Sequence, residues 1–153
     1  MNARFFRSSG FTFVELLLVV SLLSLLVASL APSISIRSGG IEAATKKVVS
    51  DLRYAQEQAM MTNVNHGIQF NNGGAYVMYR QSSATPVADP LRLTSFSEDL
   101  SEFRNVSLQT TLQVEFDSVG RPVLGGGSSV VLSNGAGTRT LRVVANTGLV
   151  EVL

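Results

Sequence analysis

A run of twenty-one residues near the amino terminus constrains this chain more than any other feature. From Phe11 to Ala31 there is no Lys, Arg, Asp, Asn, Gln or His, and a single carboxylate, Glu15, interrupts the run. A helix of that length rises about 31 Å, which matches one hydrocarbon core. Because Arg4 and Arg7 precede the run, the positive-inside rule keeps the amino terminus in the cytoplasm. The run therefore predicts a membrane-spanning helix with the rest of the chain outside the cytoplasm.

The carboxylate of Glu15 is the most informative group within this run. An ionisable side chain in an apolar span costs roughly 2–3 kcal/mol at mid-bilayer, less near the interface, and marks a function with a partner. The helix supplies no such partner, since the next basic residue is Arg37. A partner from another chain would fit, because a cut before Phe11 creates a cationic amino group in the same apolar layer. Pairing of these charges would favour one stagger of packed helices, which predicts a role for Glu15 in assembly.

Two alternatives for the apolar run remain. A general secretory signal peptide would use the small residues at 29–31, but its apolar stretch is usually ~7–15 residues long and needs no acid. A plain membrane anchor explains the length of the run. It leaves Glu15 and the Gly10-Phe11 junction unexplained.

The junction itself resembles that of a known family. Gly10 is followed by Phe-Thr-Phe-Val-Glu-Leu-Leu-Leu-Val-Val, and Pro32 closes the apolar stretch. This closely resembles the class III leader and first helix of type IV pilins and type II secretion pseudopilins, with Phe13 where many relatives have Leu or Met. The resemblance implies that residues 1–10 are a leader, that a prepilin peptidase cuts between Gly10 and Phe11 and N-methylates Phe11, and that Glu15 matches the family's assembly acid.

Residues 32–62 predict a kinked, amphipathic continuation of the helix. Pro32 removes an amide donor and bends the helix, and Gly39-Gly40 adds a second weak point. Beyond it, apolar residues recur three or four apart on one face. They are Ile41, Ala44, Val48, Leu52, Ala55 and Ala59. The other faces carry charge pairs at i,i+4, namely Glu42-Lys46, Lys47-Asp51 and Arg53-Glu57. We expect the apolar stripe to pack on a sheet.

Residues 63–153 predict a β-rich globular domain. Short apolar runs alternate with Gly, Asn and Ser punctuation, Asn71–Gly74 has the composition of a hairpin turn, and Gln81–Pro90 is expected to be a polar connection. The expected strands are Val64–Phe70, Ala75–Arg80, Leu91–Phe96, Val106–Leu108, Leu112–Phe116, Val130–Leu132, Thr140–Val144 and Val150–Leu153. Hairpin-length links favour an antiparallel arrangement, so the fold class is α+β.

Motifs in the second half narrow the resemblance. The stretches are Asp51-Leu52-Arg53-Tyr54-Ala55-Gln56, Val64 to Phe70, Val114-Glu115-Phe116-Asp117 with Gly120-Arg121, and Leu141-Arg142-Val143 with Thr147-Gly148. In this order they resemble the GspH/FimT group of minor pseudopilins. The resemblance implies a pilin-like fold, with a β-sandwich of two sheets on the long helix, and a place at or near the tip of a pseudopilus or pilus.

No constellation of residues predicts catalysis, a cofactor or a metal. The chain has no cysteine, and its one histidine, His66, shares a strand face with apolar residues, which favours a partly buried or edge-strand histidine. The acids Glu98, Asp99 and Glu102 lack the spacing of a calcium loop, so we expect a solvated connection. The glycines at 125–127 are not followed by the Lys-Ser/Thr pair of a phosphate-binding loop.

DNA capture is the main alternative function, because some relatives in this group bind DNA through basic residues of the carboxyl region. Arg121, Arg139 and Arg142 are the candidates. We favour the interpretation that they are ordinary surface arginines, because the chain has no basic tail. Affinity for phosphate grows with the number of contacts, and three contacts are few. Without Arg4 and Arg7 the chain has ten basic and eleven acidic residues, which also gives no preference for a polyanion.

The sequence thus predicts a minor pseudopilin of a type II secretion system that is not an enzyme. We expect it in the inner membrane as a single-pass protein with a periplasmic carboxyl domain, and then in a periplasmic filament. Its expected partners are a prepilin peptidase, membrane lipid, and other pilins or pseudopilins through the amino-terminal helix, while nucleic acid is not expected. A minor type IV pilin of the FimT kind, acting in pilus assembly or DNA uptake, is the alternative. A major shaft subunit is disfavoured, because the paired cysteines common in major pilins are missing.

Overall fold

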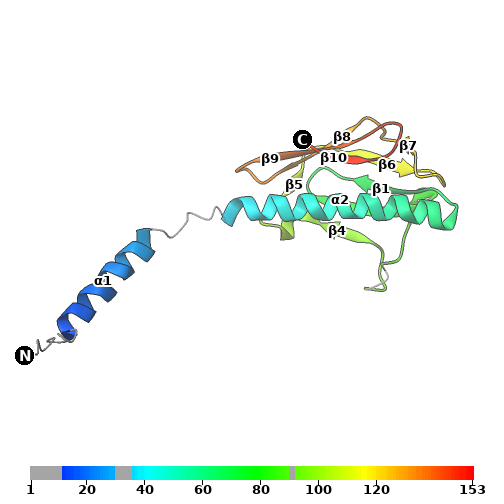
Figure 1. Ribbon diagram of the computed structural model, residues 1–153. Helices are drawn as coiled ribbons and strands as arrows, with labels where there is room; N and C mark the ends of the chain where they lie inside the picture. The colour runs from blue at the N-terminus through cyan, green and yellow to red at the C-terminus, as the bar shows by residue number, and fades with distance from the viewer. Residues whose placement is uncertain (1–11, 30–35, 90–91) are drawn as a thin grey trace, which may run out of the picture. The chain divides into compact units, whose positions relative to one another are not determined.

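The computed structural model describes residues 12–29, 36–89 and 92–153 (Figure 1). The chain divides into two compact units, Met1–Ile34 and Ser35–Leu153. Helix α1 (Phe13–Ser29) is the described part of the first unit. Within the described residues, no helix combines the length and the apolarity needed to cross a membrane. The predicted span at 11–31 extends past the described residues at both ends, so it stays a prediction.

Helix α2 (Ile36–Thr62) opens the second unit and confirms the predicted apolar stripe. Five of the six stripe residues are fully buried and the sixth, Ile41, is 4% exposed. The predicted weak point at Gly39-Gly40 is helical and lies inside α2. Gly40 is needed there for packing, since a Cβ would lie 2.7 Å from the carbonyl oxygen of Phe103.

Two antiparallel sheets pack against the apolar face of this helix. The first has the order β3-β2-β1-β6-β7, with β4 also paired to β2, and the second has the order β10-β9-β8-β5. The strands of the first sheet are β1 (His66–Phe70), β2 (Ala75–Arg80), β3 (Ser82–Pro86), β4 (Ser97–Asp99), β6 (Leu112–Phe116) and β7 (Pro122–Leu124). Those of the second are β5 (Ser107–Leu108), β8 (Ser129–Ser133), β9 (Thr138–Val143) and β10 (Val150–Val152), and a short helix, η1 (Leu100–Glu102), follows β4.

One hydrophobic core joins α2 to both sheets. It contains the α2 stripe, inward residues of the first sheet such as Ile68 and Val114, and inward residues of the second such as Leu132 and Leu141. The α+β class and the packing of the helix on antiparallel sheets are confirmed. The hairpin turn after β1 is also confirmed, because the Asn71 amide donates to the Ala75 carbonyl.

The strand predicted at Leu91–Phe96 is wrong where the structure describes it. Residues 92–94 form a turn and a bend, Ser95 makes only an isolated bridge to Ala88, and the strand β4 begins after Phe96. Leu93 has a φ of 56°, which is incompatible with an extended strand. Three edge strands lie outside the predicted ones. They are β3, inside the expected polar connection, β4, and β7.

Candidate functional site

The first turn of α1 holds Glu15 through a residue that the sequence analysis missed. The Thr12 hydroxyl accepts a hydrogen bond from the Glu15 amide at 3.3 Å, and the Thr12 carbonyl accepts one from Leu16 at 3.2 Å. Thr12 is therefore the N-cap and Glu15 the third helical residue, which is the spacing of a capping box. The Thr-x-x-Glu pattern could have revealed this in the sequence. The bond shown is made by the Glu15 backbone amide, and the spacing alone would let its carboxylate complete a capping box.

The rest of α1 presents apolar side chains to its surroundings. The described ones are exposed on every face, from 47% at Val19 to 76% at Phe13. Its two described serines bond internally, since Ser21 and Ser24 donate to carbonyl oxygens of the preceding turn at 2.8 Å. A helix that is apolar all round needs cover from lipid or from other helices.

Three predicted site residues lie outside the described residues. Gly10 and Phe11, at the expected peptidase cleavage and methylation site, and Pro32, the expected kink, therefore remain predictions.

Motif segments far apart in the sequence meet at the side chain of Gln56 on α2. Its amide donates to the carbonyl oxygens of Gly120 at 2.7 Å and Thr147 at 3.0 Å. Gly120 has a φ of 81° and Gly148 a φ of 70°, and a Cβ on Gly148 would lie 2.8 Å from both the Gln56 amide nitrogen and the Gly120 oxygen. Both glycines are thus required by conformation, and the second also by space. The resemblance motifs at 51–56, 114–121 and 147–148 converge to fasten two loops on α2.

A buried polar cluster lies between α2 and the first sheet. The Lys47 ammonium contacts both Asp51 carboxylate oxygens at 2.8 and 2.9 Å and the Glu98 carboxylate at 3.2 Å. The Tyr76 hydroxyl donates to Asp51 at 2.5 Å, and Arg92 approaches Glu98 at 3.5 Å. The predicted Lys47-Asp51 pair is confirmed. The solvated connection predicted for Glu98 is wrong, because this residue is only 8% exposed and paired to two cations.

Charge and burial oppose each other in this cluster. Burial raises the pKa of the Asp51 carboxyl, although the hydrogen bonds from Lys47 and Tyr76 act in the other direction. Burial works to lower the pKa of Lys47, but the bonds and charges of Asp51 and Glu98 outweigh it and raise that pKa. Burial and the neighbouring Asp51 carboxylate raise the pKa of the Tyr76 hydroxyl. The charged groups of the cluster pair with one another. The Lys47 ammonium also lies over the Phe96 ring, 5.3 Å from its centroid. We assign it to holding α2 on the sheet.

His66 lies on a strand as expected, but it is buried and the strand is central, so it is neither partly buried nor at an edge. It is 3% exposed on β1, between β2 and β6, and its Nδ1 lies 2.8 Å from the Val64 carbonyl oxygen. Among the described residues, no three His, Asp or Glu side chains are grouped so that they could hold a metal ion.

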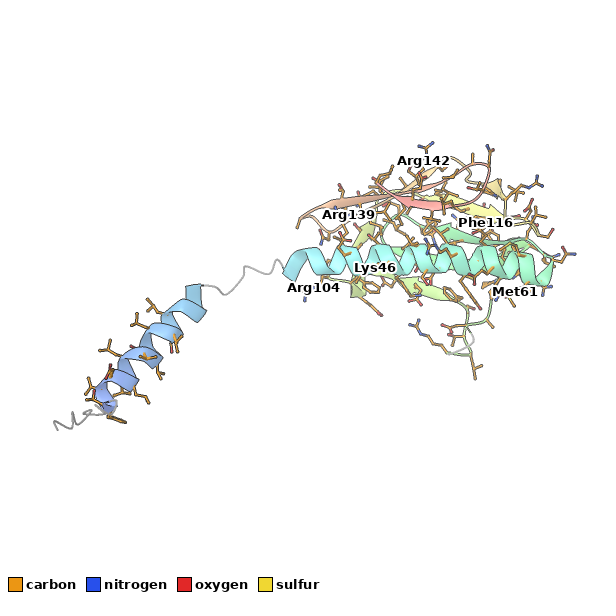
Figure 2. All side chains as sticks on the ribbon, in the orientation of Figure 1. Lys46, Met61, Arg104, Phe116, Arg139 and Arg142 are labelled. Atoms are coloured by element: carbon orange, nitrogen blue, oxygen red, sulfur yellow. The ribbon has the colours of Figure 1, made fainter. Side chains whose placement is uncertain are left out.

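The three candidate DNA-binding arginines do not form one patch. Arg121 pairs with Asp117 at 3.1 Å, and Arg139 donates to Glu42 at 2.8 Å. Arg142 is exposed and lies three residues beyond Arg139 on β9, so the two point to opposite faces of the strand. Figure 2 shows Arg139 near α2 and Arg142 at the upper edge of the domain. Two of the three charges are balanced by carboxylates and the third stands apart.

The fold is shared with solved minor pilins. Two crystal structures of the type IV minor pilin FimU of Pseudomonas aeruginosa strain PAO1, in different space groups, resemble it with TM-scores of 0.57 and 0.54. The sequences are 18% and 16% identical, and the matches cover 74% and 73% of this chain and 87% and 91% of FimU. No curated protein matches the sequence significantly. The fold is therefore that of a pilin-like protein.

A family comparison is more specific. A family model described as type II transport protein GspH matches residues 44–148, which include most of α2 and every strand except β10. The chain belongs to the GspH family. Family and fold together show a pilin-like minor subunit, from a family of structural proteins.

Proposed function

We propose that this chain is a minor pseudopilin, a non-enzymatic subunit of the periplasmic filament of a type II secretion system. The observation that carries the proposal is the exposed, apolar surface of α1, with Glu15 alone bearing charge in its first turn. Membership of the GspH family supports the choice of machine. The helix would lie in the inner membrane first, with the carboxyl domain in the periplasm, and then pack against equivalent helices in the filament.

Processing would precede assembly. A prepilin peptidase would remove residues 1–10 by cutting between Gly10 and Phe11 and would methylate the new Phe11 amine. Replacing Gly10 with Leu is expected to block the cut, and intact-mass measurement would then show a retained leader of ten residues. Ser8→Ala is the control and should be cut normally. Normal cleavage of the Gly10→Leu protein would contradict the proposed site.

Glu15 would set the register of packed helices by pairing with the Phe11 amine of a neighbouring subunit. Since Glu15 also lies three residues after the Thr12 N-cap, at the spacing of a capping box, a capping role must be separated from the pairing role. A glutamine at this position keeps the capping pattern but loses the charge. The pairing role therefore predicts that Glu15→Gln blocks incorporation as completely as Glu15→Ala.

The test measures insertion, leader cleavage and recovery in sheared filaments for both variants. Insertion and cleavage should remain normal while recovery is lost. Glu102→Gln, an exposed acid of η1, is the matched control and should assemble normally. If Glu15→Gln assembles and Glu15→Ala does not, the residue acts as a cap and the charge-pairing role is wrong.

A minor type IV pilin is the second candidate, and the likeness to FimU favours it. The two functions differ in the filament that takes up the subunit. Purified pseudopili and type IV pili from the same cells, probed for this chain, would separate them, and neighbouring genes would provide an independent indication.

DNA uptake is the variant of that candidate for which the geometry gives least support, because two of the three arginines are paired. A mobility-shift assay on the full chain in detergent, at low and high salt, tests it. Salt-sensitive binding that Arg142→Ala abolishes would favour DNA uptake.

A further inference from the structure

A groove of about 530 Å³ lies between α2 and the end of β10. Its apolar surface comes from Val49, Tyr54 and Val152. Val49 and Tyr54 are only partly buried against the core, and Val152 is 53% exposed. The outer face of α2 from Glu42 to Glu57 forms the long wall, so the groove runs along about 22 Å of helix.

On the other side the groove is lined by Val152 of β10, a strand at the open edge of a sheet. Strand β10 is the last strand of the second sheet and pairs only with β9. Val150 lies opposite Val143, whose amide and carbonyl are both used on the far side, by Ser128 and Gly127. Hydrogen-bonding direction alternates along a strand. The amide and carbonyl of Val150, and likewise of Val152, therefore point away from β9.

The neighbouring residues confirm this alternation. The Leu149 carbonyl accepts from Val144 at 2.8 Å, and the Leu153 amide donates to Thr140 at 2.9 Å, both toward β9. The structure gives the outward groups of Val150 and Val152 no partner among the residues it describes. An unpaired edge of this kind is a template for one more strand.

The charges along the groove select the kind of strand. Glu42 at one end is neutralised by Arg139. Lys46 and Arg53 flank Val49 and are exposed, and within the described chain neither has an ion pair. The centre of the groove is thus apolar with two free cations beside it, while Glu57 lies at the far end. An acidic side chain on the occupant would be complementary to this centre.

We propose that the groove binds one extended segment of another protein, added as a strand to the open edge of β10, with alternating apolar and acidic side chains. The backbone of the segment would bond to Val150 and Val152. Its apolar side chains would cover Val49, Tyr54 and Val152, and an acidic one would lie between Lys46 and Arg53. About seven residues in extended conformation span the length of the groove. The inference does not depend on the role of Glu15 or on which filament the subunit joins.

The first test is direct binding to the full chain in detergent micelles. The probe is a fluorescein-labelled peptide, Thr-Val-Glu-Val-Glu-Val-Thr, and the matched peptide has Lys in place of both Glu residues. The acidic peptide is expected to bind saturably, and the basic one at least tenfold more weakly. Reversing both groove cations, with Lys46→Glu and Arg53→Glu together, should weaken the acidic peptide roughly tenfold. Reversing Arg142, on the opposite face of β9, should change nothing.

The second test separates strand addition from simple charge attraction. Val152→Pro removes an outward amide donor and should abolish binding, since the edge then lacks a bond to the peptide. Val152→Ala keeps the donor and should still bind. Leu153→Pro removes the adjacent donor, which bonds Thr140 on the closed side, and should also still bind. Bound peptide should slow hydrogen exchange at Val150 and Val152 but not at Leu153.

Three results would overturn the inference. One is no saturable binding of the acidic peptide. Another is binding that survives Val152→Pro while all variants remain folded by tyrosine fluorescence. The third is self-association of the full chain that Val152→Pro abolishes, because the occupant would then be a second copy of this chain.

Discussion

Helices α1 and α2 are both rich in apolar residues, yet they differ in what covers those residues. The stripe of α2 is at most 4% exposed, and the two sheets of the same chain cover it. The described apolar residues of α1 are all at least 47% exposed. Burial of apolar surface stabilises α2 within the subunit, whereas the same physical effect is available to α1 only from outside. Helix α2 therefore stabilises the fold, whereas the described apolar side chains of α1 remain exposed.

The comparison is tested most strongly by the same truncation in each helix. Leu52→Ala is expected to lower the free energy of unfolding of the carboxyl domain by about 2–5 kcal/mol, because the fully buried side chain leaves a cavity. Leu22→Ala, at a 57% exposed position of α1, should leave it unchanged. Tyrosine fluorescence during urea unfolding measures this domain alone, since all three tyrosines lie in it. Similar losses for both variants would break the distinction.

A smaller effect is expected from the polar fastening of α2. Gln56→Ala removes the bonds to Gly120 and Thr147 and should cost about 1–2 kcal/mol of domain stability. Hydrogen exchange should speed up in the loops that carry these two carbonyls. Gln58→Ala, two residues further along α2, is the control and should cost less than about 0.5 kcal/mol. No difference between the variants would show that apolar packing alone holds the helix.

The smallest expected effect is a dependence on alkaline pH. The pKa of Lys47 is raised in the folded chain, so the folded state holds this proton more tightly than the unfolded state does. The resulting stability is fully present below the ordinary pKa of 10.5 and is lost as the pH rises through the higher folded value. Melting temperatures from pH 9 upward should fall more steeply for the native chain than for Lys47→Met. If melting temperature fell equally with pH in both proteins, the Lys47 ammonium would not contribute to holding α2 on the sheet.

The sequence predicts best what depends on local periodicity. All six residues of the α2 stripe are buried as expected, and β2 and β6 have the predicted bounds, because apolar spacing alone decides these elements. The same alternation along β1 correctly predicts that His66 shares a strand face with apolar residues, although the structure buries it more fully than expected.

Features that depend on distant partners were missed. Glu98 looks like a solvated acid, and only the fold brings it to Lys47, fifty-one positions earlier. Phe96 ends a predicted strand, but in the structure a turn and a bend precede it. Its burial comes instead from stacking on the Tyr54 ring and from contacts in the core. Strand β3 has the composition of a loop, Ser-Ser-Ala-Thr-Pro, and exists because β2 offers an edge. No local pattern encodes these contacts.

The first turn of α1 is a different case, because its signal was local and was overlooked. Thr12 and Glu15 have the spacing of a capping box, which is readable in the sequence without any partner from another chain. Among the remaining site residues, the three arginines show that composition alone does not predict a binding patch. Three positive charges in one half of the chain predict a patch only if the fold places them on one face, and β9 places two of them on opposite faces.

Among the described residues, every member of the core lies at or after Ile41, so α1 contributes nothing to it. Mutation can therefore act on the two parts separately. The effect of a substitution in α1 depends on what surrounds that helix, whereas the effect of a substitution in the domain depends on whether the domain still folds. Such a division lets one part of a gene be exchanged between relatives without repacking the other, so that a lineage can keep its apolar amino-terminal helix while its globular surface diverges.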